Sequence, residues 1–133
     1  MRAVEPEGWP RGLGFTHAFA TEGEDVVLFS GVVGADPATR QLVVGGMVEQ
    51  VAQAFRNVAT VVGAAGTEPS QVMFLRIYVT DRQAYISNLQ GIGRAFREVF
   101  GGHFPAMTFL VVNGLFVPEA LVEIDGVAAI RSA

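Results

Sequence analysis

Two segments of this 133-residue chain are apolar on both faces of the strands that they would form. Alternate side chains of a strand point to opposite sides, so in segment 106–112 Met107 and Phe109 face one side and Leu110 the other. Segment 72–79 has the same two-sided pattern. A strand of this kind needs cover on both of its faces. Any fold for this chain must therefore bury both sides of part of a sheet.

Two helices are predicted between the strand segments. Over residues 47–65, apolar side chains recur every three or four positions, as on one face of a helix. These apolar residues are Val48, Val51, Ala52, Phe55, Val58, Ala59 and Val62. Gly66 is suited to end this helix. Asp81 is suited to begin a second helix, whose apolar stripe runs from Tyr85 to Val99.

Further strands are predicted on either side of the helices. Segments 14–19 and 26–31 are strand-like, and the loop between them carries a glycine among acidic residues. We expect these two segments to pair as an antiparallel hairpin. A short strand is expected at 42–44, and the chain should close with strands at 106–112 and about 120–130.

The order of these elements indicates a single α+β domain with a mixed β-sheet and two helices packed on one face. We expect residues 1–12 to form an N-terminal segment and residues 13–133 to form the domain. Because two helices can cover only one face of the sheet, we infer that other copies of the chain cover the second face. Such a homo-oligomer closes with cyclic symmetry, and it would place ligand sites between chains.

The composition excludes several kinds of site. The chain has no cysteine, so it can form no disulfide, thiol nucleophile or cysteine-bound metal site. Its basic residues are scattered arginines and its net charge is −4, which argues against a nucleic-acid partner. His17 and His103 lack a metal-binding spacing, so we expect no metal site.

No membrane or export signal is evident in the sequence. No window approaches the roughly 18 apolar residues that a membrane span needs. The N-terminal residues include charges and prolines where a signal peptide needs an apolar core. We therefore expect a soluble, cytoplasmic protein with no membrane partner.

Five segments of the chain together resemble the reactive intermediate deaminase family (Rid, or YjgF). They are LFSGVVGADPAT at 28–39, VEQVAQAFRNVATVVGAAG at 48–66, VMFLRIYVTD at 72–81, FPAMT at 104–108 and ALVEIDGVA at 120–128. The resemblance implies a chorismate-mutase-like fold and a homotrimer with ligand clefts between neighbouring subunits. It also implies hydrolysis of imines or enamines such as 2-aminoacrylate, with ammonia release and without a metal or organic cofactor.

Position 107 departs from the pattern of the best-understood family members. Those members read Pro-Ala-Arg-Ser/Thr in this strand, and the arginine holds the carboxylate of the substrate in a bidentate salt bridge. This chain has Met107 there, and a thioether carries no charge and donates no hydrogen bond. We therefore expect a small ligand with a C=N bond, but not 2-aminoacrylate.

Glu123 is the candidate catalytic residue. It matches the glutamate that orients or activates the attacking water in the family, and it stands in a strand between two apolar residues. Glu123 and Asp125 would share one face of that strand, with Cα atoms roughly 6.6 Å apart. In an apolar cleft between subunits, such a carboxylate could act as a general base or acid. The alternative is a pair of solvated carboxylates on an exposed strand.

The resemblance also assigns walls of the ligand cleft. Phe15 keeps the aromatic ring that is usually a tyrosine, while Ser30 and Gly31 match a Ser-Gly pair whose backbone approaches the ligand. Gly31 could instead mark a bulge or a strand end. Thr108 keeps a hydroxyl beside the missing arginine, and Phe109 occupies a position that is often small, which predicts a narrower or more apolar cleft.

Two further residues are candidates for substrate binding. His17 is interpreted as a hydrogen-bonding wall residue. Arg76 lies in an apolar strand and could replace the missing anion binder, although a buried or interface ion pair is the alternative. Beside the hydrolase, a small-molecule-binding trimer without catalysis and a structural trimer with vestigial clefts stay open.

Overall fold

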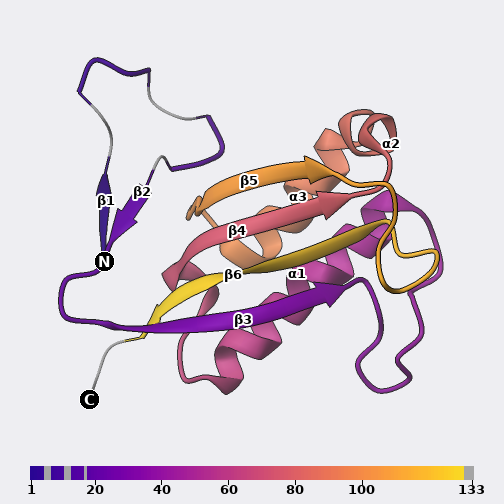
Figure 1. Ribbon diagram of the computed structural model, residues 1–133, viewed down its shortest axis with the longest axis horizontal. Helices are drawn as coiled ribbons and strands as arrows, with labels where there is room; N and C mark the ends of the chain where they lie inside the picture. Colours follow the sequence, from indigo (N-terminus) through magenta and orange to yellow (C-terminus); the bar gives the residue numbers. More distant parts are fainter. Residues whose placement is uncertain (5–6, 11–12, 17, 131–133) are drawn as a thin grey trace.

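The computed structural model describes residues 1–4, 7–10, 13–16 and 18–130. Its main sheet has four strands in the spatial order β3-β6-β4-β5 (Figure 1). These strands are β3 (Asp25–Val33), β4 (Val72–Val79), β5 (Ala106–Val111) and β6 (Val122–Ile130). Strands β4 and β5 are parallel, whereas β6 is antiparallel to both β3 and β4. The predicted α+β class with a mixed sheet is confirmed.

Both long helices lie behind the sheet in Figure 1, on the same face. The helical elements are α1 (Met47–Ala64), the 3-10 helix η1 (Pro69–Gln71), α2 (Arg82–Ile86) and α3 (Leu89–Phe100). Helix α1 packs against α3, β3 and β6. The prediction of two helices on one face is therefore confirmed, and this helix side of the sheet contains the hydrophobic core.

The core forms because the apolar stripe of α1 meets the helix-side residues of the central strands. Phe55 contacts Phe96 and Phe100 of α3 edge-to-face, with ring centroids 5.5 and 5.7 Å apart. The core residues that are at most 1% exposed include Val51, Phe55, Val58, Val62, Val72, Leu75, Ile77, Val122 and Ile124. The 3-and-4 spacing in the sequence thus located α1 and its buried face correctly.

The single second helix that the sequence predicted is divided in two. Asp81 does act as the N-cap of α2, since its carboxylate accepts a hydrogen bond from Ala84 N at 2.9 Å. The helix then breaks before α3, where the Asn88 side chain donates to the Ala84 carbonyl at 2.7 Å. Side chains of this type compete with the backbone for its hydrogen bonds and so interrupt helices.

The predicted hairpin between 14–19 and 26–31 is wrong. Strand β2 (Ala18–Ala20) pairs with β1 (Arg2–Val4) in a separate two-stranded sheet, and β3 pairs with β6. The expected strand at 42–44 is also absent, because Leu42 forms only an isolated bridge with Ala35. Local alternation indicates that a segment is extended but does not say which strand it will pair with.

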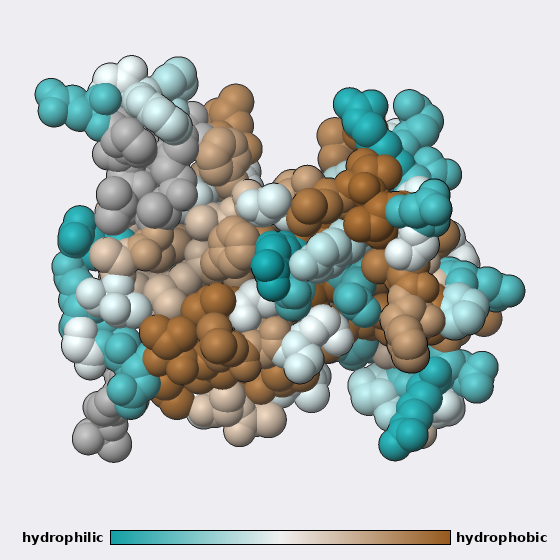
Figure 2. Space-filling view, in the orientation of Figure 1, coloured by the Kyte–Doolittle hydropathy of each residue, from teal (hydrophilic) through white to brown (hydrophobic). Residues whose placement is uncertain are grey.

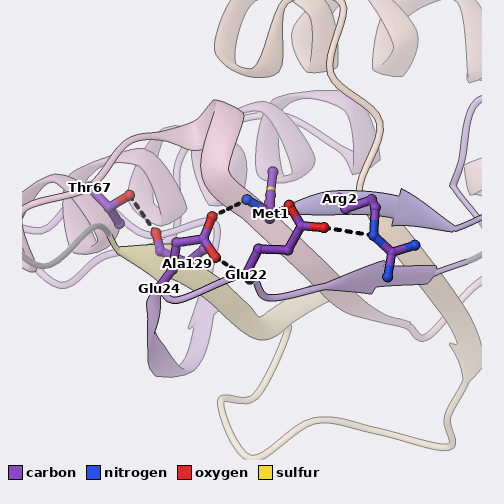
Figure 3. Close-up of polar contacts among 6 residues, drawn as sticks. All are labelled: Met1, Arg2, Glu22, Glu24, Thr67 and Ala129. Carbon is purple, nitrogen blue, oxygen red and sulfur yellow. Dashed lines mark hydrogen bonds and ion pairs between the residues drawn. The ribbon is translucent and has the colours of Figure 1, made fainter.

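Polar contacts near the start of the chain connect β1 to the segment before β3 (Figure 3). Arg2 Nε donates to Glu22 Oε1 at 2.7 Å, and the terminal ammonium of Met1 pairs with Glu24. This ammonium group lowers the pKa of Glu24. Nearby, Thr67 Oγ1 donates to the Ala129 carbonyl of β6 at 2.7 Å.

In the part of the chain that the structure describes, no helix lies over the face of the main sheet opposite α1 and α3. Figure 2 looks onto this open face and shows apolar surface over β3 together with polar groups near the middle of the sheet. Leu28 of β3 is 77% exposed, and Val26 and Leu110 are also exposed. In the isolated chain, therefore, the helices cover one face of the central strands, and part of the other face stays exposed.

Candidate functional site

A row of polar side chains crosses the open face of the sheet. Arg76 of β4 is in register with Thr108 of β5 and with Asp125 of β6. The neighbouring row holds Tyr78 of β4 and Glu123 of β6. Their strand neighbours Leu75, Ile77, Val122 and Ile124 are buried on the helix side, so the polar residues face away from the helices.

Arg76 and Asp125 form a bidentate ion pair. Arg76 Nε donates to Asp125 Oδ1 at 2.9 Å, and Arg76 Nη2 donates to Asp125 Oδ2 at 3.1 Å. The carboxylate of Asp125 raises the pKa of Arg76 through these hydrogen bonds and its negative charge. The hydroxyl of Tyr78 also donates to Asp125 Oδ2, at 3.4 Å. Arg76 therefore lies in an ion pair, and its side chain is 52% exposed in the isolated chain. An anionic ligand at this guanidinium would have to compete with Asp125.

Glu123 lies against the backbone of a bulge in β3. The pairing register of β3 and β6 shifts between Phe29 and Val32, so Ser30 and Gly31 form the irregular part of the strand. A Cβ atom placed on Gly31 would lie 2.9 Å from Glu123 Cδ, which is too close for an unstrained contact. Gly31 thus lies in a bulge, and its missing side chain leaves room for the side chain of Glu123.

The carboxylate of Glu123 is available for chemistry. Within residues 1–4, 7–10, 13–16 and 18–130, no hydrogen bond or ion pair engages it, whereas Arg76 holds Asp125 at both oxygens. The Glu123 side chain is only half-buried. An unengaged carboxylate of this kind can orient a water molecule and accept a proton from it.

A second group of predicted site residues gathers at the edge strand β5. Phe15, Met107 and Thr108 line a depression of about 460 Å³. Its other lining residues are Thr16, Phe19, Met73, Phe74, Ala106 and Val127. The segment that carries Phe15 is held there because Thr16 N donates to the Pro105 carbonyl at 3.2 Å. The Thr16 hydroxyl also donates to the Phe104 carbonyl at 2.6 Å.

Met107 borders a second and more apolar cavity on the helix side of β5. This cavity has a volume of about 230 Å³ and is also lined by Phe109. Phe109 makes an edge-on contact with the ring of Tyr85, with centroids 5.5 Å apart. Met107 is itself half-buried and packs against the core. It therefore serves as packing and as a cavity wall at the same time.

The predicted site residues fall into two groups within one chain. Glu123 and Gly31 belong to the β3-β6 side of the sheet, whereas Phe15, Met107 and Thr108 belong to the β5 edge. Strand β4 separates the two groups, and neither cavity beside Met107 is lined by Glu123. His17, the predicted wall residue, lies outside the described residues.

Sequence reasoning did not assign a site role to Tyr78 or Tyr85. Tyr78 alternates with Arg76 in β4, and this period of two is the signal that places it on the polar face. Tyr85 was assigned only to the apolar stripe of a helix, yet it lines the cavity beside Met107. No feature of the sequence indicates that cavity.

Comparison with known proteins identifies the family. A family profile described as Endoribonuclease L-PSP matches residues 14–130. The solved structure of YyfB from Yersinia pestis, a protein of unknown function in the conserved Rid protein family, superposes with a TM-score of 0.84. YyfB is 30% identical, and the match covers 97% of this chain and 98% of that one. The chain belongs to the Rid family.

Curated relatives of this Rid chain include named enzymes. The goat (Capra hircus) protein named 2-iminobutanoate/2-iminopropanoate deaminase is 32% identical over 103 residues. The human protein of the same name is 30% identical over 103 residues. Each of these matches covers 77% of this chain and 71% of the relative. The Rid resemblance stated from the five sequence segments is thus confirmed.

The described residues contain neither a membrane-spanning helix nor a cluster of metal-binding side chains. No helix among them has both the length and the apolar character needed to cross a bilayer. Within the same residues, no group of three or more His, Cys, Asp or Glu side chains is close enough to hold a metal ion.

Proposed function

We propose that this Rid chain is a cofactor-free hydrolase of imines or enamines. In the reaction, water adds to the carbon of the C=N bond and the nitrogen leaves as ammonia, so that R₂C=NH and H₂O give R₂C=O and NH₃. Family membership and relatives named as imine deaminases support this reaction type. We do not propose a nuclease, because the nine basic residues are scattered and the net charge is −4.

The unengaged carboxylate of Glu123 is the observation that carries this proposal. It lies over the Gly31 bulge, where a side chain at position 31 would displace it. From this position Glu123 would orient a water molecule toward the C=N carbon and accept its proton. Correct placement of a general base accounts for about 10²- to 10⁴-fold in rate.

We propose that the complete site forms between two subunits of a homotrimer. Within one chain, Glu123 lies apart from the walls formed by Phe15, Met107 and Thr108. Exposed apolar residues on the open face, such as Leu28, offer a surface for a second copy. Contact between copies would bring the Glu123 of one chain to the β5 edge of another.

Met107 narrows the range of substrates. Its side chain offers no charge or hydrogen-bond donor to a carboxylate, and Arg76 is already paired with Asp125. We therefore propose a substrate other than 2-aminoacrylate. The cavities beside Met107 and Phe109 are open in this chain rather than filled by those side chains, which supports a ligand-binding role over a vestigial cleft.

Substitution of Glu123 by glutamine tests the proposal. Ammonia release would be measured over a panel of neutral and carboxylated imines generated in situ. We expect Glu123→Gln to lower turnover by at least about 100-fold, with no loss of folding. Glu98→Gln is the matched control, because Glu98 is an exposed residue of α3 remote from the β3 bulge. Equal turnover by wild type and Glu123→Gln would refute the role of Glu123, whereas turnover no faster than the uncatalysed reaction over the whole panel would refute the hydrolase.

Substitution of Met107 by arginine tests the missing carboxylate anchor. If the site lacks only this group, Met107→Arg should gain turnover on imines derived from amino acids. The comparison is made with Met107→Gln, which has a similar length without the charge. Gain in the arginine variant alone would support the assignment, while equal behaviour of both variants would contradict it.

A further inference from the structure

The apolar cavity on the helix side of β5 has the construction of a binding pocket. Its floor consists of core residues that are at most 8% exposed, namely Phe55, Ile77, Ile92 and Phe96. Its rim consists of apolar residues that remain exposed, namely Leu89, Phe104 and Phe109. The remaining lining residues are Gly14, Tyr85, Gly93, Arg97 and Met107. A cavity with such walls favours an apolar group over water.

The size of the cavity sets the size of its occupant. Its volume is about 230 Å³. An engineered protein cavity of about 150 Å³ lined by Leu, Ile and Phe stays dry and binds benzene. The cavity in this chain therefore has room for a phenyl ring or a branched alkyl group. A methyl or ethyl group, as in the smallest imines, would leave most of it empty.

The polar groups at the cavity favour a neutral ligand. Tyr85 lines the cavity, and its hydroxyl has no hydrogen-bond partner among the residues that the structure describes. Burial raises the pKa of Tyr85 to about 12, so the hydroxyl stays neutral and can donate or accept a hydrogen bond. Among the residues that the structure describes, Arg97 is the one cation in the lining, and because it is solvent-exposed, an ion pair with it would contribute little to binding. Met107 contributes a thioether to the lining of the cavity, and this group carries no charge.

We propose that this cavity receives the aryl or branched alkyl group of a neutral imine substrate. The inference rests on the hydrolase proposed above and specifies its substrate class. Met107, Phe109 and Tyr85 would surround the apolar group. The C=N bond would remain outside the cavity, toward the cleft that a second subunit completes with Glu123.

Binding of non-reactive ketones tests the cavity independently of turnover. The probes are phenylacetone, acetone and phenylpyruvate, and their affinities are measured by calorimetry or ligand-observed NMR on the intact protein. We expect phenylacetone to bind at least about tenfold more tightly than acetone, since one added methylene in an apolar pocket already gives about tenfold. We also expect phenylacetone to bind at least as tightly as phenylpyruvate, which carries a carboxylate.

Gly93 provides a variant that fills the cavity without disturbing the core. A Cβ atom on Gly93 would meet only Arg97 Nη1, at 3.5 Å, an ordinary contact. We expect Gly93→Leu to weaken phenylacetone binding at least about tenfold, and to keep the protein folded because leucine favours helices. Gly63→Leu is the matched control, because Gly63 is an exposed glycine of α1 with no atom within 4 Å of its added Cβ.

The outcomes separate this inference from the hydrolase proposal. Equal binding of phenylacetone and acetone, or phenylpyruvate binding ten times more tightly than phenylacetone, would overturn the inference, even if small imines are hydrolysed. No effect of Gly93→Leu relative to Gly63→Leu would overturn it as well. Conversely, phenylacetone binding that is lost in Gly93→Leu supports the cavity, even if no imine is turned over and the hydrolase proposal fails.

Discussion

The two faces of the main sheet differ in how completely one chain covers them. On the helix side, Leu75, Ile77 and Ile124 are excluded from solvent by α1 and α3. On the open side, Leu28 is largely exposed and an ion pair lies at the centre of the sheet. One chain thus completes one hydrophobic core and leaves part of the second face exposed to solvent. The candidate functional groups lie on the incomplete face and at its β5 edge.

A pair of leucine substitutions measures this difference. Leu75→Ala removes a fully buried side chain of β4 and should lower the free energy of unfolding by about 2–5 kcal/mol. Leu28→Ala removes an exposed side chain of β3 and should change the unfolding of the monomer by less than about 0.5 kcal/mol. Urea denaturation at low protein concentration measures both values.

The same pair of variants separates folding from assembly. If the open face is a contact between copies, Leu28→Ala should weaken self-association in analytical ultracentrifugation, although the monomer stays folded. Leu75→Ala should act through folding at every concentration. A loss of monomer stability in Leu28→Ala as large as that in Leu75→Ala would contradict the division between the two faces.

The covered face was the more predictable one. The 3-and-4 spacing over 47–65 placed α1 to within a residue at its C-terminal end, and segment 72–79 coincides with β4. Partners of the short strands were not predictable, because the pairing of β2 with β1 depends on contacts that local alternation does not encode. At the break before α3 the Asn88 side chain bonds to the Ala84 carbonyl, a contact that periodicity alone does not reveal.

The candidate site was predictable only in part. Residue identities and the family resemblance selected Glu123 and Gly31, and the structure places these two in contact. Strand alternation placed Arg76 on the face opposite Leu75, but only the register with β6 identifies Asp125 as its partner. The cavity beside Met107 combines residues from α1, α2, α3 and three other segments, so no local pattern predicts it.

Removal of the ion pair should have a smaller effect than removal of Leu75. Arg76 is 52% exposed and Asp125 is 19% exposed, so Arg76 can be solvated when its partner is lost. Asp125→Asn should therefore shift the urea midpoint of the monomer much less than Leu75→Ala, and the shift should shrink in high salt. If assembly buries the pair, the same variant should weaken association more than monomer folding. A midpoint shift in the monomer equal to that of Leu75→Ala would show that one chain already buries the pair.

A change that is confined to high pH concerns Tyr85, at the edge of the covered face. Burial raises the pKa of Tyr85 from 10.0 to about 12, so between these pH values the unfolded chain releases a proton that the folded chain retains. The stability contribution of this group is complete below pH 10 and is lost as the pH rises toward 12. Over this pH range, the free energy of unfolding measured by urea denaturation should therefore fall less steeply for Tyr85→Phe than for wild type. Parallel pH curves for the two proteins would show that Tyr85 is as accessible to water in the folded chain as in the unfolded one.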